Sequence, residues 1–390
     1  MRPVKHAMME IQMTTNQFDI SRPFGTIDDR AARIYTIEND YLRVRITDYG
    51  GILVSVEAPD REGRRDHVVL GFDDIEAYVR YGGSFGAMIG RYANRIAGGH
   101  FKIDGDVYET SHNDRGSTLH GGKVGFGNRF WSVDLATKDR LKLSLVSADG
   151  DQGFPGKVCV TATYYLNGSE LGLTLVAHTN KATPVSLSTH PYFNLEGSRS
   201  QDCLGHVVTI TAVDFLETDK YQIPTGERKS VFGTVFDFTT PHAVGERIRE
   251  LDVQLEYGYG YDHFFVLAGS ETGQVLRPAV RVADRRSGRI LEVLTTQQGV
   301  QFYSGNQLNG KARGRNGFYR QSAGLAIEPT AYPNAVNQSN FPSAILLPGQ
   351  IYRQSTIYRF ITDKTPQRAA SSSRPINPVP ASGKKAWKRF

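Results

Sequence analysis

The residue best suited to acid-base chemistry in this sequence is His190, in the run Ser188-Thr189-His190-Pro191-Tyr192. Proline disfavours the helical conformation for the residue before it, so we expect His190 to have an extended backbone. Imidazole exchanges a proton near neutral pH, so a rigidly presented histidine can serve as a general acid or base. The alternative is a structural histidine at the end of a strand.

A second candidate for proton transfer is Glu328, in the run Ala326-Ile327-Glu328-Pro329-Thr330. The apolar residues before it and the proline after it predict an extended, partly buried carboxyl group. Burial raises the proton affinity of a carboxylate toward the range of a useful general base. The alternative is a glutamate paired with an arginine at a sheet edge. Together with His190, Glu328 indicates proton transfer on an uncharged polar substrate.

Motifs for other kinds of chemistry do not occur in the sequence. It has no glycine-rich phosphate loop ending in Lys-Ser/Thr, no HExxH and no paired CxxC. The glycine-rich run Tyr257–Tyr261 is not expected to open a helix, which argues against a dinucleotide site. The two cysteines, Cys159 and Cys203, form no disulfide framework and no metal spacing, and Cys159 is predicted to be a buried small hydrophobe. We therefore expect neither a cofactor nor a metal.

Two polar clusters are suited to holding a ligand near the reacting groups. Asn94 and Arg95 follow one another in the run Gly90–Ile96 and offer an amide and a planar donor fork for hydroxyl groups. The alternative is a buried arginine that braces a loop. His120 precedes two glycines, which let the backbone turn sharply and leave room for a ligand near the ring.

A third cluster places Asp262 among aromatic residues, in the run Tyr261–Phe265. Aromatic rings beside a carboxylate suit sugars, because the C–H face of a sugar stacks on a ring while its hydroxyls donate to the acid. The alternative is an aspartate in a turn. The neighbouring His263 is expected to be structural, because no partner ligands have metal spacing around it.

The elements that must position these residues are predicted to be strands, because apolar residues alternate with polar ones along several runs. One short helix is predicted from about Asp73 to Arg80. The chain is therefore predicted to be all-β, a large antiparallel β-sandwich of two packed sheets. The alternating positions are Leu42, Val44 and Ile46; Leu141, Leu143 and Leu145; Leu171, Leu173, Leu175 and Ala177; and Tyr352, Gln354, Thr356, Tyr358 and Phe360.

Composition predicts one domain over residues 25–363, because no linker or shift in composition interrupts that range. Residues 1–24 are predicted to be a loosely ordered lead-in, and residues 364–390 a disordered basic tail rich in Pro, Ser, Ala and Lys. The tail carries seven basic residues and no acidic one, and removing them from the formal charge of +6 leaves −1 for the rest of the chain. The excess of positive charge therefore lies in the tail, and we expect no nucleic-acid partner.

No apolar run is long enough to span a membrane, and residues 1–25 lack the apolar centre of a secretory signal. We therefore expect a cytoplasmic protein without a membrane partner.

Seven motifs occur together, in the order GRYANRI, LHGG, DQGFPG, STHPYFNL, GYDHFF, GVQFYSGN and NFPSAILLPGQIY. With these motifs in this order, the chain closely resembles the aldose 1-epimerase (galactose mutarotase) family from about residue 35 to 362. The resemblance implies a β-sandwich of many antiparallel strands with an open sugar cleft on one sheet.

The resemblance also implies roles for individual residues in anomer exchange of free aldohexoses such as galactose and glucose. His190 looks like the general acid that protonates the ring oxygen, and Glu328 looks like the base that takes the proton of the anomeric hydroxyl. His120 resembles a second histidine that hydrogen-bonds near the reacting oxygens. The residues that resemble the groups fixing the sugar hydroxyls are Asn94, Arg95, Asp262 and Gln301.

Departures from the family pattern leave two other functions open. Pro329 and Thr330 stand after Glu328 where Thr-Gln is usual, Asn334 replaces the familiar aspartate, and Gln298 stands where proline is common. These changes bear on sugar preference more than on chemistry. A related hexose-6-phosphate 1-epimerase would need extra cations in the cleft, for which Arg91 and Arg129 are the candidates. A non-catalytic sugar-binding protein would lack His190 or Glu328, and both are present.

Overall fold

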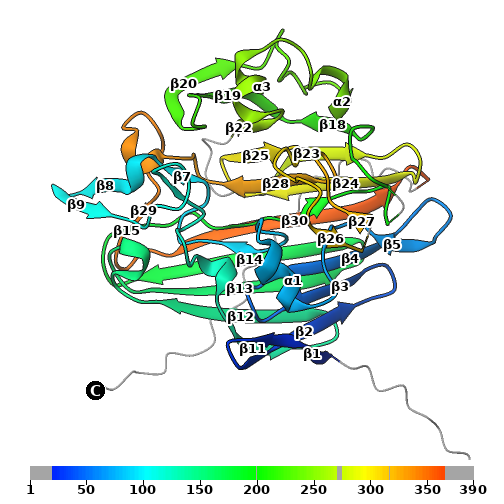
Figure 1. Ribbon diagram of the computed structural model, residues 1–390, viewed down its shortest axis with the longest axis horizontal. Helices are drawn as coiled ribbons and strands as arrows, with labels where there is room; N and C mark the ends of the chain where they lie inside the picture. Colours follow the sequence, from blue (N-terminus) through cyan, green and yellow to red (C-terminus); the bar gives the residue numbers. More distant parts are fainter. Residues whose placement is uncertain (1–19, 199, 270–274, 316, 365–390) are drawn as a thin grey trace, which may run out of the picture.

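The computed structural model describes residues 20–198, 200–269, 275–315 and 317–364. Within these ranges the chain forms antiparallel sheets with only short helices, as the alternation predicted (Figure 1). Residues 1–19 of the predicted lead-in and 365–390 of the predicted tail lie outside the described residues. Ser21, Arg22 and Pro23, which the prediction placed in the lead-in, pair with the second strand of the first sheet. No described helix is long and apolar enough to cross a membrane.

The largest sheet has nine strands and forms one wall of the core. Three of the predicted alternating runs lie in it, and their apolar positions are buried. Its strands, in spatial order, are β11 (Ser132–Ala136), β12 (Arg140–Ser147), β13 (Val158–Asn167), β14 (Glu170–Thr179), β30 (Tyr352–Thr362), β24 (Arg289–Thr295), β23 (Arg277–Ala283), β18 (Val207–Ile210) and β21 (His242–Ala243).

A five-stranded sheet is built from consecutive strands and packs on this wall, because β2 contacts β12 and β13 while β4 contacts β30. Its strands follow the chain order and are shown in blue in Figure 1. They are β1 (Ser21–Ile27), β2 (Arg30–Glu38), β3 (Arg43–Thr47), β4 (Leu53–Pro59) and β5 (Arg65–His67).

A six-stranded sheet carries three of the polar residues discussed above, Asp262, Gln301 and Glu328. Figure 1 shows its strands above β30, toward the green strands and helices at the top of the view. One apolar core cluster takes residues from this sheet and from both others. The strands, in spatial order, are β17 (Tyr192–Phe193), β28 (Leu325–Thr330), β25 (Gly299–Tyr303), β22 (Asp262–Leu267), β19 (Ala212–Thr218) and β20 (Pro224–Ser230).

Short two-stranded pairs connect and border these sheets. One of them, β7 with β10, holds residues of the site, since β7 begins directly after Asn94 and β10 ends directly before His120. The pairs are β7 (Arg95–Ile96) with β10 (Thr118–Leu119), β6 (Met88–Ile89) with β16 (Ser188–Thr189), β8 (His100–Ile103) with β9 (Asp106–Glu109), β15 (Thr183–Pro184) with β29 (Ile345–Leu346), and β26 (Arg313–Gly314) with β27 (Gly317–Phe318).

The predicted helix is present as α1 (Ile75–Tyr81). Asp74 caps its start by accepting a hydrogen bond from Ala77 N at 2.8 Å, and Gly82 ends it with a positive φ. Two further short helices were not predicted, α2 (Val244–Arg247) and α3 (Val253–Gly258). The glycine-rich run Tyr257–Tyr261 closes α3 and opens no helix, in agreement with its interpretation.

One prediction about the core is wrong. Cys159 is exposed, because it is an outward-facing position of β13 between the buried Val158 and Val160. Along a strand successive side chains point to opposite faces, so a small residue between two valines belongs to the other face. Cys203 is the buried cysteine.

Candidate active site

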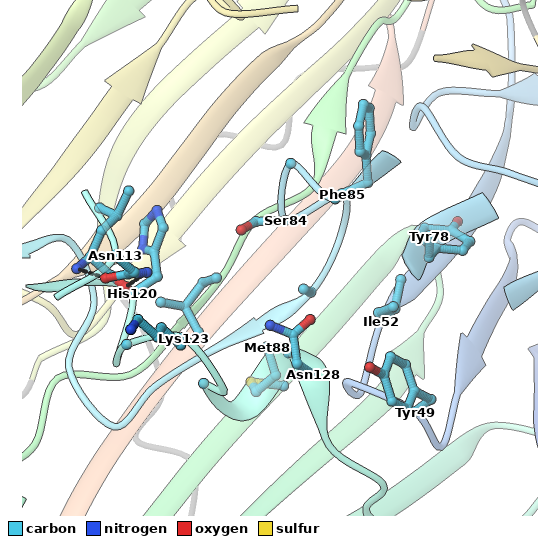
Figure 2. Close-up of a pocket in the computed structure, with 18 residues that line it drawn as sticks. Tyr49, Ile52, Tyr78, Ser84, Phe85, Met88, Asn113, His120, Lys123 and Asn128 are labelled. Carbon is cyan, nitrogen blue, oxygen red and sulfur yellow. Dashed lines mark hydrogen bonds between the residues drawn. The ribbon is translucent and has the colours of Figure 1, made fainter. Parts of the chain in front are cut away.

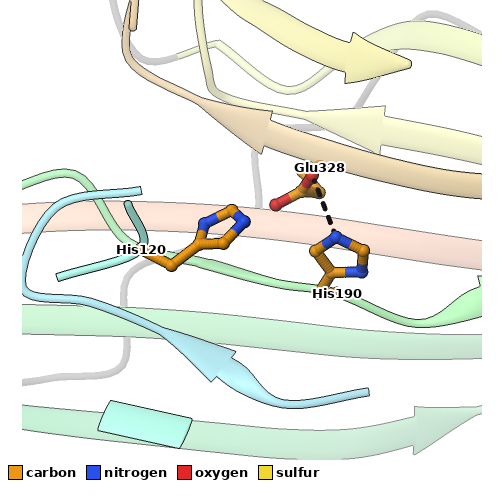
Figure 3. Close-up of side chains that lie close together, drawn as sticks. All are labelled: His120, His190 and Glu328. Carbon is orange, nitrogen blue, oxygen red and sulfur yellow. Dashed lines mark ion pairs between the residues drawn. The ribbon is translucent and has the colours of Figure 1, made fainter. Parts of the chain in front are cut away.

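One cavity of about 200 Å³ brings together all seven residues selected from the sequence. The proton-transfer candidates His190 and Glu328 share it with His120, as Figure 3 shows. The predicted hydroxyl-binding residues Asn94, Arg95, Asp262 and Gln301 complete its polar lining.

His190 is fixed by its backbone between β16 and β17. Its N–H donates to Ala87 O at 3.0 Å, and its carbonyl accepts from Gly86 N at 2.8 Å. The ring packs against Tyr192, with the ring centroids 4.8 Å apart. The side chain is 6% exposed, so the imidazole is held in one place inside the cavity.

Glu328 lies in the six-stranded sheet, directly opposite Gln301 of β25. Its side chain is 4% exposed, and its Oε1 lies 3.6 Å from His190 Nε2 (Figure 3). Pro329 is tolerated next to it because β17 pairs only with Leu325 and Ala326, so this end of β28 has an open edge. The Pro329 carbonyl accepts from Ser188 Oγ and from Gln354 Nε2, which anchors the strand beside the carboxylate.

Burial moves the pKa values of these two groups in opposite directions. Desolvation lowers the pKa of His190 to about 4. Desolvation, helped by the charge of Asp262 and opposed by Arg95, raises the pKa of Glu328 to about 8. Near neutral pH the pair therefore carries one proton, and desolvation places it on Glu328.

His120 is half-buried, and its hydrogen bond fixes which ring nitrogen carries the proton. The backbone N–H of Asn94 donates to His120 Nδ1 at 3.3 Å, so this nitrogen must offer a lone pair. Desolvation, His190 and Arg95 lower the pKa of His120 well below its usual value, so the ring is neutral. The proton of the neutral ring is then on Nε2, which makes His120 a hydrogen-bond donor.

The glycine after His120 lets the backbone turn sharply, as predicted, and it also allows a close backbone contact. Gly121 has φ +84°, and a Cβ at this position would lie 2.0 Å from the carbonyl oxygen of Gly90. The close approach of two backbones therefore requires glycine there.

His120, His190 and Glu328 are also the one group in the described ranges with metal-ligand atoms close together, all within 4.8 Å of one another. Their chemistry does not fit a resident metal. A metal needs a free lone pair on each histidine, whereas Nδ1 of His120 already accepts from Asn94 and Nε2 carries the proton.

The opposite side of the cavity is a network of hydrogen bonds around Asp262. Gln301 Nε2 donates to Asp262 Oδ1 at 2.6 Å. Arg95 Nε forms an ion pair with Asp114 Oδ2 at 2.7 Å, and Asn94 Oδ1 accepts from Arg95 N at 2.8 Å. Desolvation raises the pKa of Asp262, while Arg95 and the amide donors oppose that shift. The network thus presents fixed donors and acceptors to a polar ligand.

Other residues of the site were not assigned from the sequence. Tyr192 and Tyr303 line the cavity, and each lies two positions from a selected residue, His190 and Gln301. Side chains two apart in a strand share a face, so the alternation could have indicated both tyrosines. Gln222 contacts Asp262 from outside the cavity, and no motif marks it. His263 is structural as predicted, with its Nδ1 accepting from Asp262 N.

The two arginines considered for a phosphate lie outside the cavity lining. Arg91 is 2% exposed and donates to the carbonyls of Ala148, Pro155 and Gly156 and to the hydroxyls of Ser147 and Thr183. Arg129 pairs with Asp151 at 2.5 Å and donates to Val124 O. Both are loop braces, so neither supports a hexose-phosphate site.

A second cavity of about 190 Å³ adjoins the first and shares Gly83, Ser84, Leu119 and His120 with it. Figure 2 shows His120 at one end and Tyr49 at the other. The acid-base pair does not line this second cavity, which places the chemistry in the first.

Comparisons with known proteins agree with this geometry. The sequence model of the aldose 1-epimerase family matches residues 33–359. The chain is 42% identical to bovine galactose mutarotase, over 88% of this chain and 96% of the relative. It is 41% identical to human galactose mutarotase, over 84% and 93% of the two chains. It is 35% identical to the aldose 1-epimerase of Escherichia coli K12, over 86% and 97%.

Solved structures show the same likeness. An aldose epimerase homologue from C. elegans superposes with a TM-score of 0.78 at 28% identity, covering 85% of this chain and 99% of the other. Galactose 1-epimerase from Lactobacillus acidophilus superposes with a TM-score of 0.77 at 25% identity, covering 88% and 98%. The predicted β-sandwich is thus confirmed.

Proposed function

This chain belongs to the aldose 1-epimerase family and is an isomerase, and from that premise we propose how its residues exchange the α and β anomers of a free aldohexose. Galactose and glucose are the proposed substrates. The observation that carries the proposal is the contact between His190 and Glu328, 3.6 Å apart and almost fully buried. One proton shared by such a pair supplies an acid and a base at once.

The reaction needs the charged form of the pair, with the proton on His190. Sugar hydroxyls that donate to Glu328 stabilise its carboxylate, and a ring oxygen that accepts from His190 stabilises the imidazolium. Both contacts offset the desolvation that otherwise keeps the proton on Glu328. Substrate binding therefore prepares the pair for proton transfer.

Ring opening then moves two protons in concert. Glu328 takes the proton of the anomeric hydroxyl, the O–H electrons form the C1 carbonyl, and the bond from C1 to the ring oxygen breaks. His190 gives its proton to the departing ring oxygen. Rotation about the bond between C1 and C2 presents the other face of the aldehyde, and reclosure reverses both transfers to give the other anomer.

The remaining residues hold the sugar during this rotation. His120 donates Nε2–H near the reacting oxygens. Asn94, Arg95, Asp262 and Gln301 bind the hydroxyls that do not react. A neutral sugar bound in this way has defined positions for C1 and the ring oxygen, which is the main requirement for fast proton transfer.

We further propose that residues 25–363 act as one domain, because a single apolar cluster joins its three large sheets. A cytoplasmic location is proposed from the charged and polar residues throughout positions 1–25.

Polarimetry tests the proposed function. Freshly dissolved α-D-galactose and α-D-glucose relax to their equilibrium rotation, and purified protein is expected to speed this relaxation without changing the final rotation. Heat-denatured protein is the control. An unchanged relaxation rate for both sugars would contradict the proposal.

A further inference from the structure

Gln222 lies in the turn between β19 and β20, and none of the motifs includes it. The turn is rigid. Asp219 Oδ1 accepts from Tyr221 N at 2.8 Å and from Ile223 N at 3.0 Å, and Gln222 N donates to Asp219 O at 2.9 Å. Gln222 has φ +62° and is only 4% exposed. A turn fixed in this way directs one polar side chain inward.

The amide of Gln222 joins two arginines to Asp262. Its Oε1 accepts from Arg95 Nη2 at 3.1 Å and from Arg115 Nη2 at 2.8 Å, and its Nε2 donates to Asp262 Oδ2. Guanidinium groups only donate and a carboxylate only accepts, so this orientation of the amide satisfies every partner. The reverse orientation would place donor against donor and acceptor against acceptor.

These contacts fix the Asp262 carboxylate in its plane. Gln222 binds Oδ2, and Gln301 binds Oδ1 at 2.6 Å. Each oxygen keeps one further lone pair for a hydroxyl of the ligand. A carboxylate held at one oxygen alone can rotate, whereas two amide donors leave one orientation.

The same amide fastens the neighbouring loop to the site. Arg115 Nη2 also donates to Tyr221 O at 3.1 Å. Asp114, next to Arg115, pairs with Arg95 at 2.7 Å. Gln222 is thus where the β19–β20 turn, the loop before β10 and the strand of Asp262 meet.

We propose that Gln222 is a positioning residue for substrate binding: it orients Asp262 and Arg95 so that they bind neighbouring hydroxyls of a neutral aldose. This role rests on the proposed function for its substrate, but the geometry of Asp262 can be measured without sugar. Gln222 does not line the cavity, so it acts through these two residues.

The test compares two substitutions of Gln222. Gln222→Met keeps the volume and removes every hydrogen bond, and it is expected to raise KM for galactose about tenfold while kcat changes less than about threefold. Gln222→Glu keeps the acceptor for both arginines and places a second carboxylate against Asp262. Its KM is expected to exceed that of Gln222→Met at pH 7.5 and to fall toward the wild-type value near pH 5.5, where the two carboxyl groups share a proton.

Gln254 provides the matched control. It is 6% exposed, and its amide bonds to the backbone and hydroxyl of Thr218, outside the cavity. Gln254→Met and Gln254→Glu are expected to lower the melting temperature without changing KM or its pH dependence. If the Gln222 variants behave like the Gln254 variants, Gln222 is merely structural and the proposal is overturned.

A second readout separates this proposal from the proposed function. In protein without sugar, carbon NMR of the side-chain carboxyl groups reports the pKa of Asp262. Gln222→Met is expected to raise that pKa, because a donor to the carboxylate is lost, while Gln254→Met leaves it unchanged. An unchanged Asp262 pKa in Gln222→Met would overturn the positioning role even if the wild-type protein proved inactive on galactose.

Discussion

Two buried polar regions of this protein, one around Arg91 and one around Glu328 and His190, differ in how completely their groups are paired. Arg91 donates to five acceptors in the loops around it. The carboxyl group of Glu328 forms no hydrogen bond within the described residues, and its ion-pair contact with His190 is 3.6 Å long. Arg91 and Arg95 belong to one motif, yet only Arg95 lines the cavity.

This difference in pairing indicates that the Arg91 region supports the fold and that the Glu328 region serves activity. A buried charge with several hydrogen-bond partners supports the fold, because removing it would leave those acceptors unpaired. A buried carboxyl group without donors costs stability when it ionises, and it keeps its hydrogen-bonding capacity for a ligand. We therefore expect substitutions in the first region to change stability, and substitutions in the second to change activity.

The largest expected effect is on activity. Glu328→Gln and His190→Asn are each expected to lower kcat/KM for galactose by about a thousandfold, because each removes one member of the proton-transfer pair. Polarimetry measures the rate, and circular dichroism with thermal unfolding verifies the fold. A loss of less than tenfold in either folded variant would show that the pair is not the catalyst.

In the Arg91 region the expected effect is on stability. Arg91→Met is expected to lower the free energy of unfolding by about 3 kcal/mol, because the carbonyls and hydroxyls around the guanidinium lose their donor. Its kcat/KM, measured well below the melting temperature, is expected to stay within about threefold of wild type. The exposed Arg286, which pairs with Glu196, is the control, and Arg286→Met is expected to lower the free energy of unfolding far less than Arg91→Met does. Equal losses of stability in the two variants would contradict the comparison.

Substitution of Glu328 is expected to have a smaller effect on stability than Arg91→Met, and of opposite sign. Its pKa is raised from 4.5 to about 8, so the folded protein binds the proton more tightly than the unfolded chain does. Ionisation of Glu328 therefore lowers stability as the pH rises between these values. Glu328→Gln is expected to gain about 2 kcal/mol relative to wild type between pH 5 and pH 6.5. Urea unfolding at both pH values measures the gain, and the exposed Glu227→Gln should show none.

Much of this architecture could be predicted from the sequence, because each prediction rested on a local property. The alternation of Leu171 to Ala177 fixes a face of β14, and the proline after His190 fixes its extended backbone. The ordered motifs identified all seven residues that meet in the cavity. These features depend on residues near one another in the chain.

What could not be predicted depends on contacts between distant segments. Gln222 lies 40 residues from Asp262, and only the folded sheet brings them together. Arg91 and Arg95 look alike in the motif, but Arg91 donates to the surrounding loops while Arg95, in β7, lines the cavity. The prediction for Cys159 failed for a different reason. Its small size suggested burial, whereas its position in the alternation of β13 places its side chain on the exposed face.

The pH dependence of kcat/KM is the most direct test of the central claim that His190 and Glu328 share one catalytic proton. Below about pH 4 the pair gains a second proton and has no base, and above about pH 8 it loses the only proton and has no acid. After subtraction of the spontaneous rate, we predict a plateau between these values and a tenfold fall per pH unit above the upper one. A rate that stays constant from pH 7 to pH 10 would contradict the account.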